Sequence, residues 1–286
     1  MSTDAFNALA CPLDGDSLTQ AGASWRCPAG HSFDVARQGY LHLLPVQKKR
    51  SLDPGDSKEM VAARQRFLNA GYFQPVAEAV NAAVLRDTIG TNHPVACMDA
   101  GCGEGYYLRQ LATTDLQLSL IGLDISKWAT LAAAKQDKRP RWVVGSNANL
   151  PVLPETLDVL LCLFGFPVYS EFARVLKTGG VLIQADAGPN HLRELREIIY
   201  PSLKPEKMPA EHAPEGFSRL GTQTVSYSLT LDSQNAIADL LAMTPHLYRA
   251  SAEGRARAEA LASLTVTVEV TLQRFLRQAD PATTTP

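Results

Sequence analysis

The sequence predicts an α/β fold, in which helices cover both faces of a parallel sheet, together with a small N-terminal module. Short apolar runs alternate with helical segments from residue 94 onward, and a glycine-rich turn follows the first of these runs. Apolar runs without polar alternation are typical of strands buried on both faces of a parallel sheet. Two Cys-Pro turns upstream of residue 45 mark the separate module.

Composition divides the chain into four segments. We expect a compact module over 1–45, a polar linker over 46–58, the α/β domain over 59–278 and a flexible tail over 279–286. The linker is recognised by a Pro-Gly pair and by a run of three basic residues, Lys48-Lys49-Arg50.

Two helices are predicted between the linker and the first strand. The first begins at Asp56, with Glu59 three residues later as in a capping box, and ends near Asn69 because Gly71 follows. The second follows Pro75, and its apolar face is formed by Val76, Ala79, Val80 and Ala83.

The strands and helices of the predicted sheet then follow in order. Strands are expected at 95–99, 118–124, 141–145, 157–162 and 181–185, and helices at 129–135 and 171–176. The turn Lys177-Thr178-Gly179-Gly180 separates the last helix from the last strand. In such a sheet the carboxyl ends of the strands form the edge at which ligands bind.

The overall composition favours a cytoplasmic protein without a membrane segment. The chain has 286 residues and a net charge of −2, and its N-terminus lacks the features of a secretion signal. The cysteines are odd in number and scattered, so we expect no disulfide framework. The balanced charge favours a small-molecule enzyme, although a local basic patch is enough for RNA binding.

A glycine-rich loop, Asp99-Ala100-Gly101-Cys102-Gly103-Glu104-Gly105-Tyr106, follows the first predicted strand and opens a helix. Its glycines let the backbone turn sharply and approach a ligand, and the helix N-terminus attracts an anionic group. Dinucleotide-binding enzymes use a similar turn, but Asp99 would repel a pyrophosphate and suits the amino group of a methionine moiety. The loop therefore predicts S-adenosylmethionine as the cofactor, with Asp99 and Gly101 among its contacts.

Residues at the ends of the next two strands complete the predicted cofactor site. Asp124 ends the second strand, where a carboxylate can accept hydrogen bonds from both ribose hydroxyls, and Ile125 can pack against the adenine. The alternative role for Asp124 is capping of the following helix. Ser146 and Asn147 follow the third strand and can bind the adenine edge. Together with the turn before the last strand, these features predict a class I methyltransferase with a Rossmann-like sheet.

Several longer motifs are more specific than the glycine loop. They are Cys11-Pro12-Leu13-Asp14, Cys27-Pro28-Ala29-Gly30-His31, Gly39-Tyr40-Leu41-His42, Asp53-Pro54-Gly55-Asp56-Ser57, Arg66-Phe67-Leu68-Asn69-Ala70-Gly71-Tyr72, Gly103-Glu104-Gly105-Tyr106-Tyr107 and Gly188-Pro189-Asn190-His191. In this order they make the chain resemble, from residue 11 to about residue 250, the bacterial 23S rRNA (guanine-N1)-methyltransferases of the guanine(745), hairpin 35 type. The resemblance implies a zinc-binding N-terminal module that helps to hold RNA, and a class I domain that methylates a hairpin guanine.

The resemblance also implies which residues contact the cofactor. They are Gly103 and Glu104 in the loop, the aromatic position Phe73, and His191. The alternative for Phe73 is packing in the core behind the loop. The alternative for His191 is a side chain that faces solvent at a helix start.

The metal site is the point at which the chain departs from the family pattern. That pattern is Cys-x2-Cys with Cys-x3-His, whereas this chain has Asp14 in place of the second cysteine. The expected ligands are therefore Cys11, Asp14, Cys27 and His31. Three alternatives are open: zinc with Asp14 as a ligand, weak zinc binding by three ligands, or a zinc-free module held by aromatic packing.

The implied substrate is a hairpin of 23S ribosomal RNA, with no membrane partner, and we allow for a homodimer. Guanine N1 bears a proton at neutral pH, so a base must accept it. Asp186, just after the last strand, is the positional candidate, and a capping role is its alternative. Phe164 and Phe166 are candidates for stacking on an extruded guanine. A small-molecule methyltransferase and a non-catalytic RNA-binding factor are the alternative functions.

Overall fold

The computed structural model describes residues 3–45, 51, 53–203 and 212–279. Its strands are β1 (Thr3–Ala5), β2 (Thr19–Ala21), β3 (Ser24–Arg26), β4 (Ser32–Asp34), β5 (Tyr40–His42), β6 (Val95–Ala100), β7 (Leu118–Asp124), β8 (Arg141–Val144), β9 (Leu157–Leu163), β10 (Leu176–Ala187), β11 (Phe217–Leu231) and β12 (Leu264–Arg277). Its helices are α1 (Lys58–Asn69), α2 (Gln74–Asp87), α3 (Tyr106–Leu111), α4 (Lys127–Gln136), α5 (Tyr169–Val175), α6 (Arg193–Ile199), α7 (Gln234–Ala242), α8 (His246–Arg249) and α9 (Ala252–Glu259).

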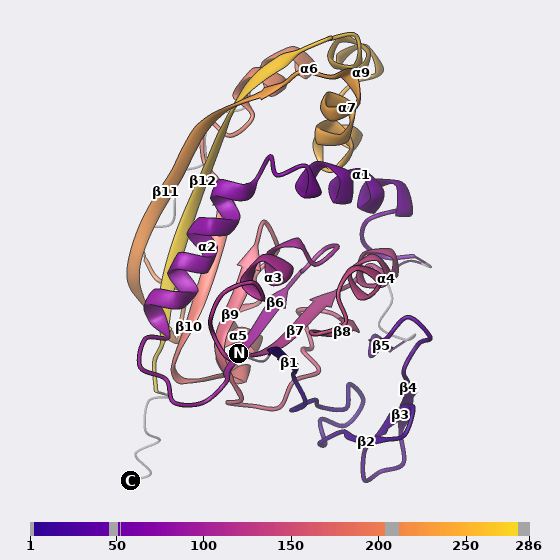
Figure 1. Ribbon diagram of the computed structural model, residues 1–286, viewed down its shortest axis with the longest axis vertical. Coiled ribbons are helices and arrows are strands. Elements are labelled where there is room, and N and C mark those ends of the chain that lie inside the picture. The colour runs from indigo at the N-terminus through magenta and orange to yellow at the C-terminus, as the bar shows by residue number, and fades with distance from the viewer. Residues whose placement is uncertain (1–2, 46–50, 52, 204–211, 280–286) are drawn as a thin grey trace.

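A nine-stranded sheet forms the centre of the described molecule, in the order β11-β12-β10-β9-β6-β7-β8-β5, with β1 beside β7 (Figure 1). Strands β6 to β10 pair in parallel with their neighbours within this group. The hairpin of β11 and β12 extends the sheet in the antiparallel sense from β10. The predicted class I α/β fold is therefore confirmed, and the sheet is mixed because of a hairpin that the sequence analysis did not predict.

The parallel pairing brings the ends of three strands together. Asp99 of β6 pairs with Gly122 of β7, so the loop after β6 lies beside the last residues of β7. Asp124, which ends β7, pairs with Val144, which ends β8. The glycine loop and the turns after β7 and β8 consequently lie at one edge of the sheet.

The two faces of the sheet are covered by different kinds of element. Helices α2, α3 and α4 pack on one face, where they bury Val80, Leu108 and Ala133 (Figure 1). On the other face, α5 contributes Phe172 and the N-terminal segment contributes Leu41. Both faces are covered, as predicted, but the described residues 3–45, which contain no helix, cover part of the second face.

The N-cap of helix α1 lies one residue later than predicted. Ser57, and not Asp56, is the N-cap, because its hydroxyl accepts a hydrogen bond from Met60 N at 3.3 Å. Asp56 precedes the helix, and its side chain forms an ion pair with Arg64 of α1. The helix ends as expected before Gly71, whose φ is 84°.

Strands β1 and β5 attach the N-terminal region to the central sheet. β1 pairs in parallel with β7, and β5 pairs in parallel with β8. The three-stranded sheet of β2, β3 and β4 lies between them along the chain. Arg141 of β8 packs on Trp25 of β3, with its guanidinium carbon 4.9 Å from the ring centroid. Two short pieces of the segment expected as a separate module therefore belong to the main sheet.

Residues 53–57, expected in the linker, pack against the end of β7 and the start of α4, and we call them the strap. Asp53 Oδ2 accepts a hydrogen bond from Trp128 Nε1 at 2.8 Å. The Asp56 carbonyl accepts one from Ser126 Oγ at 2.7 Å. The strap is thus a packed segment of the α/β domain.

The C-terminal third builds the long hairpin and a helical layer at one of its ends. Helices α6, α7 and α9 lie together there (Figure 1). Residues 280–286 of the expected tail and the basic run 48–50 lie outside the described residues. Across the described residues, no helix combines the length and the apolar character needed to span a membrane.

Candidate functional site

The glycine loop joins β6 to α3 and is held by the end of β7. The amides of Gly101 and Cys102 donate to the Leu123 carbonyl at 2.7 and 2.9 Å. Gly105 has a φ of 82° directly before α3, and a Cβ at this position would lie 2.5 Å from Trp142. Both the backbone conformation and the available space therefore require glycine at position 105.

Asp99 is buried at the end of β6, with 1% of its surface exposed. Neither of its carboxylate oxygens has a hydrogen-bond partner among the described residues. Burial, and to a lesser degree the charge of Asp124, raises the pKa of Asp99 to about 8. A buried carboxyl group without a partner is costly, and a bound ammonium group supplies such a partner. Asp99 therefore fits the amino group of a methionine moiety.

Asp124 lies at the end of β7, beside the loop. Its Oδ2 accepts a hydrogen bond from Gly103 N at 2.9 Å, and its Oδ1 accepts one from Ser126 N at 2.7 Å. Desolvation raises the pKa of Asp124, while these two amides act in the opposite direction. The bond to Ser126 orders the start of α4, and each oxygen keeps a second acceptor site for a ribose hydroxyl. Ile125, the residue after Asp124, has an exposed side chain.

The two loop residues Gly103 and Glu104 differ in their surroundings. Glu104 is buried, and its Oε2 accepts hydrogen bonds from Arg109 Nη2 at 2.9 Å and from Gln136 Nε2. Gly103 lies beside Arg64, whose Nη1 would be 3.6 Å from a Cβ on this glycine. The structure therefore brings Gly103 together with Asp99 and Asp124 at the loop, whereas the Glu104 carboxylate connects α3 and α4.

Ser146 and Asn147 follow β8 at the same edge of the sheet. Asn147 Nδ2 donates to the Ala100 carbonyl at 3.4 Å and to the Phe166 carbonyl at 3.2 Å. Its Oδ1 is buried without a partner among the described residues, and it is therefore an acceptor that a ligand can use. The Ser146 hydroxyl accepts a hydrogen bond from Ala148 N at 3.2 Å and so stabilises the local turn.

Four rings, those of Phe73, Tyr107, Phe164 and His191, gather near the ends of β9 and β10, and we call them the aromatic cluster. Phe164 has a φ of 56° and is 40% exposed. Its ring centroid lies 6.5 Å from those of Phe73 and Tyr107 and 6.2 Å from that of His191. Phe73 is buried, as the core-packing alternative requires, and it also belongs to the cluster. A positive φ at a phenylalanine is rare and is typical of functional sites.

His191 is oriented by the backbone of β12. Its Nδ1 accepts a hydrogen bond from Glu269 N at 3.2 Å, so we assign the ring proton to Nε2. Burial lowers the pKa of His191 to about 4, and the ring is therefore neutral at pH 7. The Glu269 carboxylate accepts from the backbone amide of Asn190 at 3.2 Å and from its side-chain amide at 3.1 Å. His191 is thus partly buried, with Nδ1 held as an acceptor by the β12 backbone, and does not simply face solvent.

Asp186, the candidate base, lies near the end of β10. Its Oδ2 accepts a hydrogen bond from Gln184 Nε2 at 2.7 Å, and Gln184 Oε1 accepts one from Tyr169 OH at 3.0 Å. Phe164 N donates to the Ala185 carbonyl at 2.8 Å. The Asp186 carboxylate is therefore fixed in orientation. Asp186 directly follows Ala185, whose carbonyl accepts the hydrogen bond from Phe164 N.

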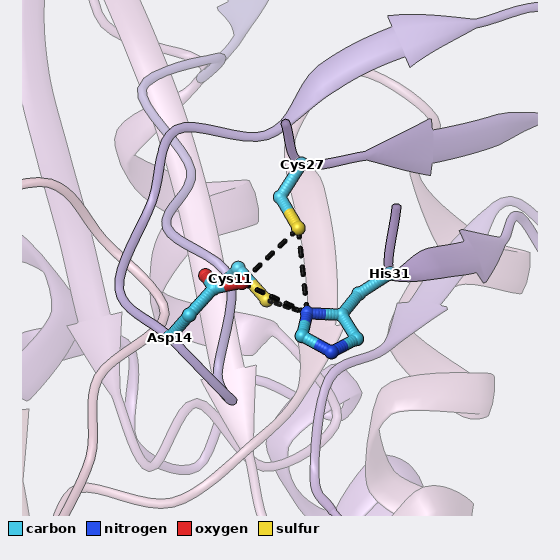
Figure 2. Close-up of side chains that lie close together, drawn as sticks. All are labelled: Cys11, Asp14, Cys27 and His31. Carbon is cyan, nitrogen blue, oxygen red and sulfur yellow. Dashed lines mark hydrogen bonds and ion pairs between the residues drawn. The ribbon is translucent and has the colours of Figure 1, made fainter. Parts of the chain in front are cut away.

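Cys11, Asp14, Cys27 and His31 form one cluster, in which a donor atom of each lies within 4.8 Å of every other (Figure 2). His31 Nδ1 lies 2.8 Å from Asp14 Oδ2, 3.4 Å from Cys27 Sγ and 3.5 Å from Cys11 Sγ. Cys27 Sγ lies 3.2 Å from Asp14 Oδ2. The structure therefore brings together all four residues expected from the sequence.

These separations suit a tetrahedral metal ion. Bonds of about 2.0 to 2.3 Å around zinc place neighbouring donor atoms about 3.3 to 3.8 Å apart. The sulfur–nitrogen distances lie in this range, and only small shifts bring the oxygen into it. Asp14 Oδ1 accepts a hydrogen bond from Asp16 N at 2.9 Å, which turns Oδ2 toward the cluster. This amide, together with the cluster side chains, lowers the pKa of Asp14 to about 2, as an anionic ligand requires.

Two residues of the site were not found from the sequence. Arg64 has the sequence context of any polar helix residue, and only its contact with the loop distinguishes it. Glu269 stands between two valines in a strand, and a lone acid in such a pattern is a detectable signal.

Comparison with known proteins covers both parts of the chain. Residues 9–52 match the zinc-ribbon family described as "RlmA, N-terminal", and residues 98–184 match the methyltransferase domain. The chain is 30% identical to the 23S rRNA (guanine(748)-N(1))-methyltransferase of Streptomyces fradiae, over 95% of this chain and 96% of that protein.

Two further relatives have provisional names as 23S rRNA (guanine-N(1)-)-methyltransferases. One, from Micromonospora griseorubida, is 34% identical over 96% of this chain and 99% of its own length. The other, YxjB of Bacillus subtilis, is 32% identical over 93% of this chain and 95% of its own length. The chain therefore belongs to the family of RlmA-type 23S rRNA guanine-N1 methyltransferases, in which a zinc ribbon precedes the methyltransferase domain.

Proposed function

We propose that this chain transfers a methyl group from S-adenosylmethionine to N1 of a guanine in a hairpin loop of 23S rRNA. The observation that supports this most directly is the full-length similarity to relatives whose names state this reaction, since it spans the ribbon and the methyltransferase domain together. Because the substrate is bacterial ribosomal RNA, we place the activity in the cytoplasm.

The residues at the carboxyl edge fit the cofactor part by part. S-Adenosylmethionine, when bound, supplies an electrophilic methyl group on a sulfonium sulfur. Asp99 would bind its ammonium group and Asp124 its ribose hydroxyls, for the reasons of burial and acceptor capacity given above. The other residues proposed to contact it are Gly101, Gly103 and the Glu104 backbone in the loop, Ile125, Ser146 and Asn147 around the adenine, and Phe73 and His191 near the methionine end.

The aromatic residues after β9 would receive the guanine. Phe164 is held at a positive φ, and Phe166, two residues on, is 87% exposed. An extruded base gains stability by stacking on such rings. Asp186 would accept the N1 proton, since its carboxylate is fixed by Gln184 and it directly follows Ala185, whose carbonyl accepts a hydrogen bond from Phe164 N. Alignment of the donor and acceptor atoms would supply much of the remaining rate.

The ribbon would bind one Zn²⁺ through Cys11, Asp14, Cys27 and His31. The mutual distances of the four donor atoms and the anionic state of Asp14 support this set. Zinc in such a site cross-links the two Cys-Pro turns and so supplies stability to a sheet of three short strands.

Primer extension on 23S rRNA from a deletion strain tests the reaction. An N1-methyl group blocks Watson–Crick pairing, so reverse transcriptase should stop at the modified guanine in the wild type and read through it in the deletion strain. Complementation with the intact gene should restore the stop. The position of the stop distinguishes guanine 748, the target named for the Streptomyces fradiae relative, from guanine 745. An unchanged pattern of stops would contradict the proposal.

Titration calorimetry with S-adenosylmethionine separates an enzyme from an RNA-binding factor that has lost its cofactor. We expect binding to the wild-type chain, and its absence at millimolar cofactor would favour the binding factor. Methylation of a small acceptor in place of the hairpin would favour a small-molecule enzyme.

Metal analysis of the purified chain tests the ribbon. We expect one zinc per chain in the wild type and in Asp14→Cys, and less in Asp14→Ala. A zinc-free wild type beside a loaded Asp14→Cys variant would favour the zinc-free alternative. The homodimer stays a prediction, which the mass measured by light scattering would test.

A further inference from the structure

Arg64 of α1 holds its guanidinium beside the glycine loop, next to Gly103. Nη1 forms an ion pair with one oxygen of Asp56, and Nη2 donates to the Met243 carbonyl at 2.9 Å. A guanidinium has five N–H bonds, of which these described contacts use two. The side chain is 24% exposed, so its charge is partly withdrawn from water. Arg64 is therefore a cation held in place beside Gly103, and three of its N–H bonds are not used by these described contacts.

The strap holds the partner of this guanidinium in place. The Asp56 carbonyl accepts the Ser126 hydroxyl, and the Ser126 amide donates to Asp124. Gly55 allows this close approach, because its φ is 84° and a Cβ there would lie 2.9 Å from Ile125. The strap, the end of β7 and the guanidinium thus form one connected set around the loop.

The charges of this set match a zwitterionic ligand. Asp99 is an acid without a partner among the described residues, and Asp124 is a second acid whose oxygens suit a diol. Two acids alone would attract an ammonium group but repel the carboxylate attached to the same carbon. A cation beside the loop offsets this repulsion, and the Arg64 guanidinium lies beside Gly103.

We propose that Arg64 binds the carboxylate of the amino-acid tail of S-adenosylmethionine, while Asp99 binds the ammonium group of the same tail. This assignment rests on the proposed function, because it takes that cofactor as the ligand. The remaining N–H bonds of Arg64 would donate to the carboxylate in charge-assisted hydrogen bonds, and Asp56 would keep the guanidinium in position. Arg64 is thus a cofactor-binding residue supplied by the N-terminal helix.

Arg66 provides a matched control on the same helix. Its guanidinium binds Asp239 through two parallel hydrogen bonds, Nε to Oδ2 at 2.9 Å and Nη2 to Oδ1 at 2.5 Å. Its side chain is 62% exposed, and its contact is with α7. The two arginines therefore share charge, helix and an acidic partner, but differ in their position relative to the loop.

The test compares S-adenosylmethionine with its decarboxylated form, which differs from it in lacking the carboxylate. Calorimetric titration of the wild-type chain should give a dissociation constant about 10- to 100-fold lower for S-adenosylmethionine, the worth of one charge-assisted contact. Arg64→Met should lose this factor and bind the decarboxylated form about as well as the wild type does. Arg64→Lys should keep part of the preference for S-adenosylmethionine over its decarboxylated form. This variant replaces Arg64→Met in the test if Arg64→Met does not fold. Arg66→Met should bind both compounds as the wild type does.

Two results would overturn the assignment. One is an Arg64→Met variant that binds S-adenosylmethionine as the wild type does, and the other is an equal loss for both compounds, which would indicate a general disturbance of the loop. These results are distinguishable from failure of the proposed function. A wild-type chain that binds the cofactor with the expected preference but leaves the rRNA unmethylated would contradict the function and support the role of Arg64.

Discussion

Replacement of Asp99 by Asn removes a titrating group from the centre of the sheet while preserving its shape. In the ligand-free chain, burial raises the pKa of Asp99 from 3.8 to about 8. Between these two values the folded chain binds the proton more tightly than the unfolded chain does. The free energy of unfolding therefore falls as the pH rises from about 4 to about 8. The Asp99→Asn variant has no such proton and should not show this part of the decrease.

The size of the effect follows from the shift. One pKa unit corresponds to about 1.4 kcal/mol, and pH 7 lies about three units above the unperturbed pKa, so neutralising Asp99 costs the folded state about 4 kcal/mol at that pH. We expect the free energy of unfolding of Asp99→Asn, relative to that of the wild type, to rise by about 2 to 3 kcal/mol between pH 5 and pH 7. The same variant should bind S-adenosylmethionine more weakly, because an amide is a poorer partner for an ammonium group.

Urea unfolding followed by tryptophan fluorescence at pH 5, 6, 7 and 8 measures both chains without ligand. The difference between them cancels the titration of all other groups. Asp115→Asn, at an exposed position, is the control and should follow the wild type at every pH. A difference between Asp99→Asn and the wild type that does not change with pH would refute the reasoning, because Asp99 would then be hydrated or hydrogen-bonded in the folded chain.

Three further predictions concern Gly105 in the glycine loop, Phe164 in the aromatic cluster and the metal site. Gly105→Ala should lower the free energy of unfolding by about 2 to 4 kcal/mol in urea, from the positive φ and the contact with Trp142; an effect below about 1 kcal/mol would contradict this. Phe164→Ala should weaken hairpin RNA binding about 10- to 100-fold in a gel-shift titration, and more strongly than it weakens cofactor binding. A chelator should remove zinc from the wild type at a lower concentration than from Asp14→Cys, because thiolate is the softer ligand, and equal release would argue against Asp14 as a ligand.

The parts of the fold that were predicted well have strong local signals. β7 was predicted with its observed bounds, since the apolar run from Leu118 ends at a glycine and an acid. The glycine loop and the four metal-site residues were found because each depends on residue type at a fixed spacing. The start of α1 was misplaced because Asp56 and Ser57 are both good N-cap residues, and the ion pair with Arg64 engages the side chain of Asp56.

The parts that were not predicted depend on contacts between distant segments. β11 is rich in serine and threonine, and it becomes a strand through pairing along its whole length with β12. The strap was expected to be a linker because Pro54 and Gly55 are typical of linkers, and its packing depends on Ser126 and Trp128, some 70 residues later. The sequence marks Arg64 only as one of two basic residues on the first helix, and its place beside Gly103 depends on the loop that α1 meets in three dimensions.

The ribbon enters and leaves through the central sheet, since β1 pairs with β7 before it and β5 pairs with β8 after it. The N-terminal region is attached to the central sheet at two places, and the sheet therefore determines where it lies relative to the glycine loop. The metal cluster is therefore tied to the same sheet that carries the glycine loop. Deletion of residues 1–45 would remove β1 and β5 from that sheet together with the metal cluster, so we expect it to destabilise the α/β domain as well.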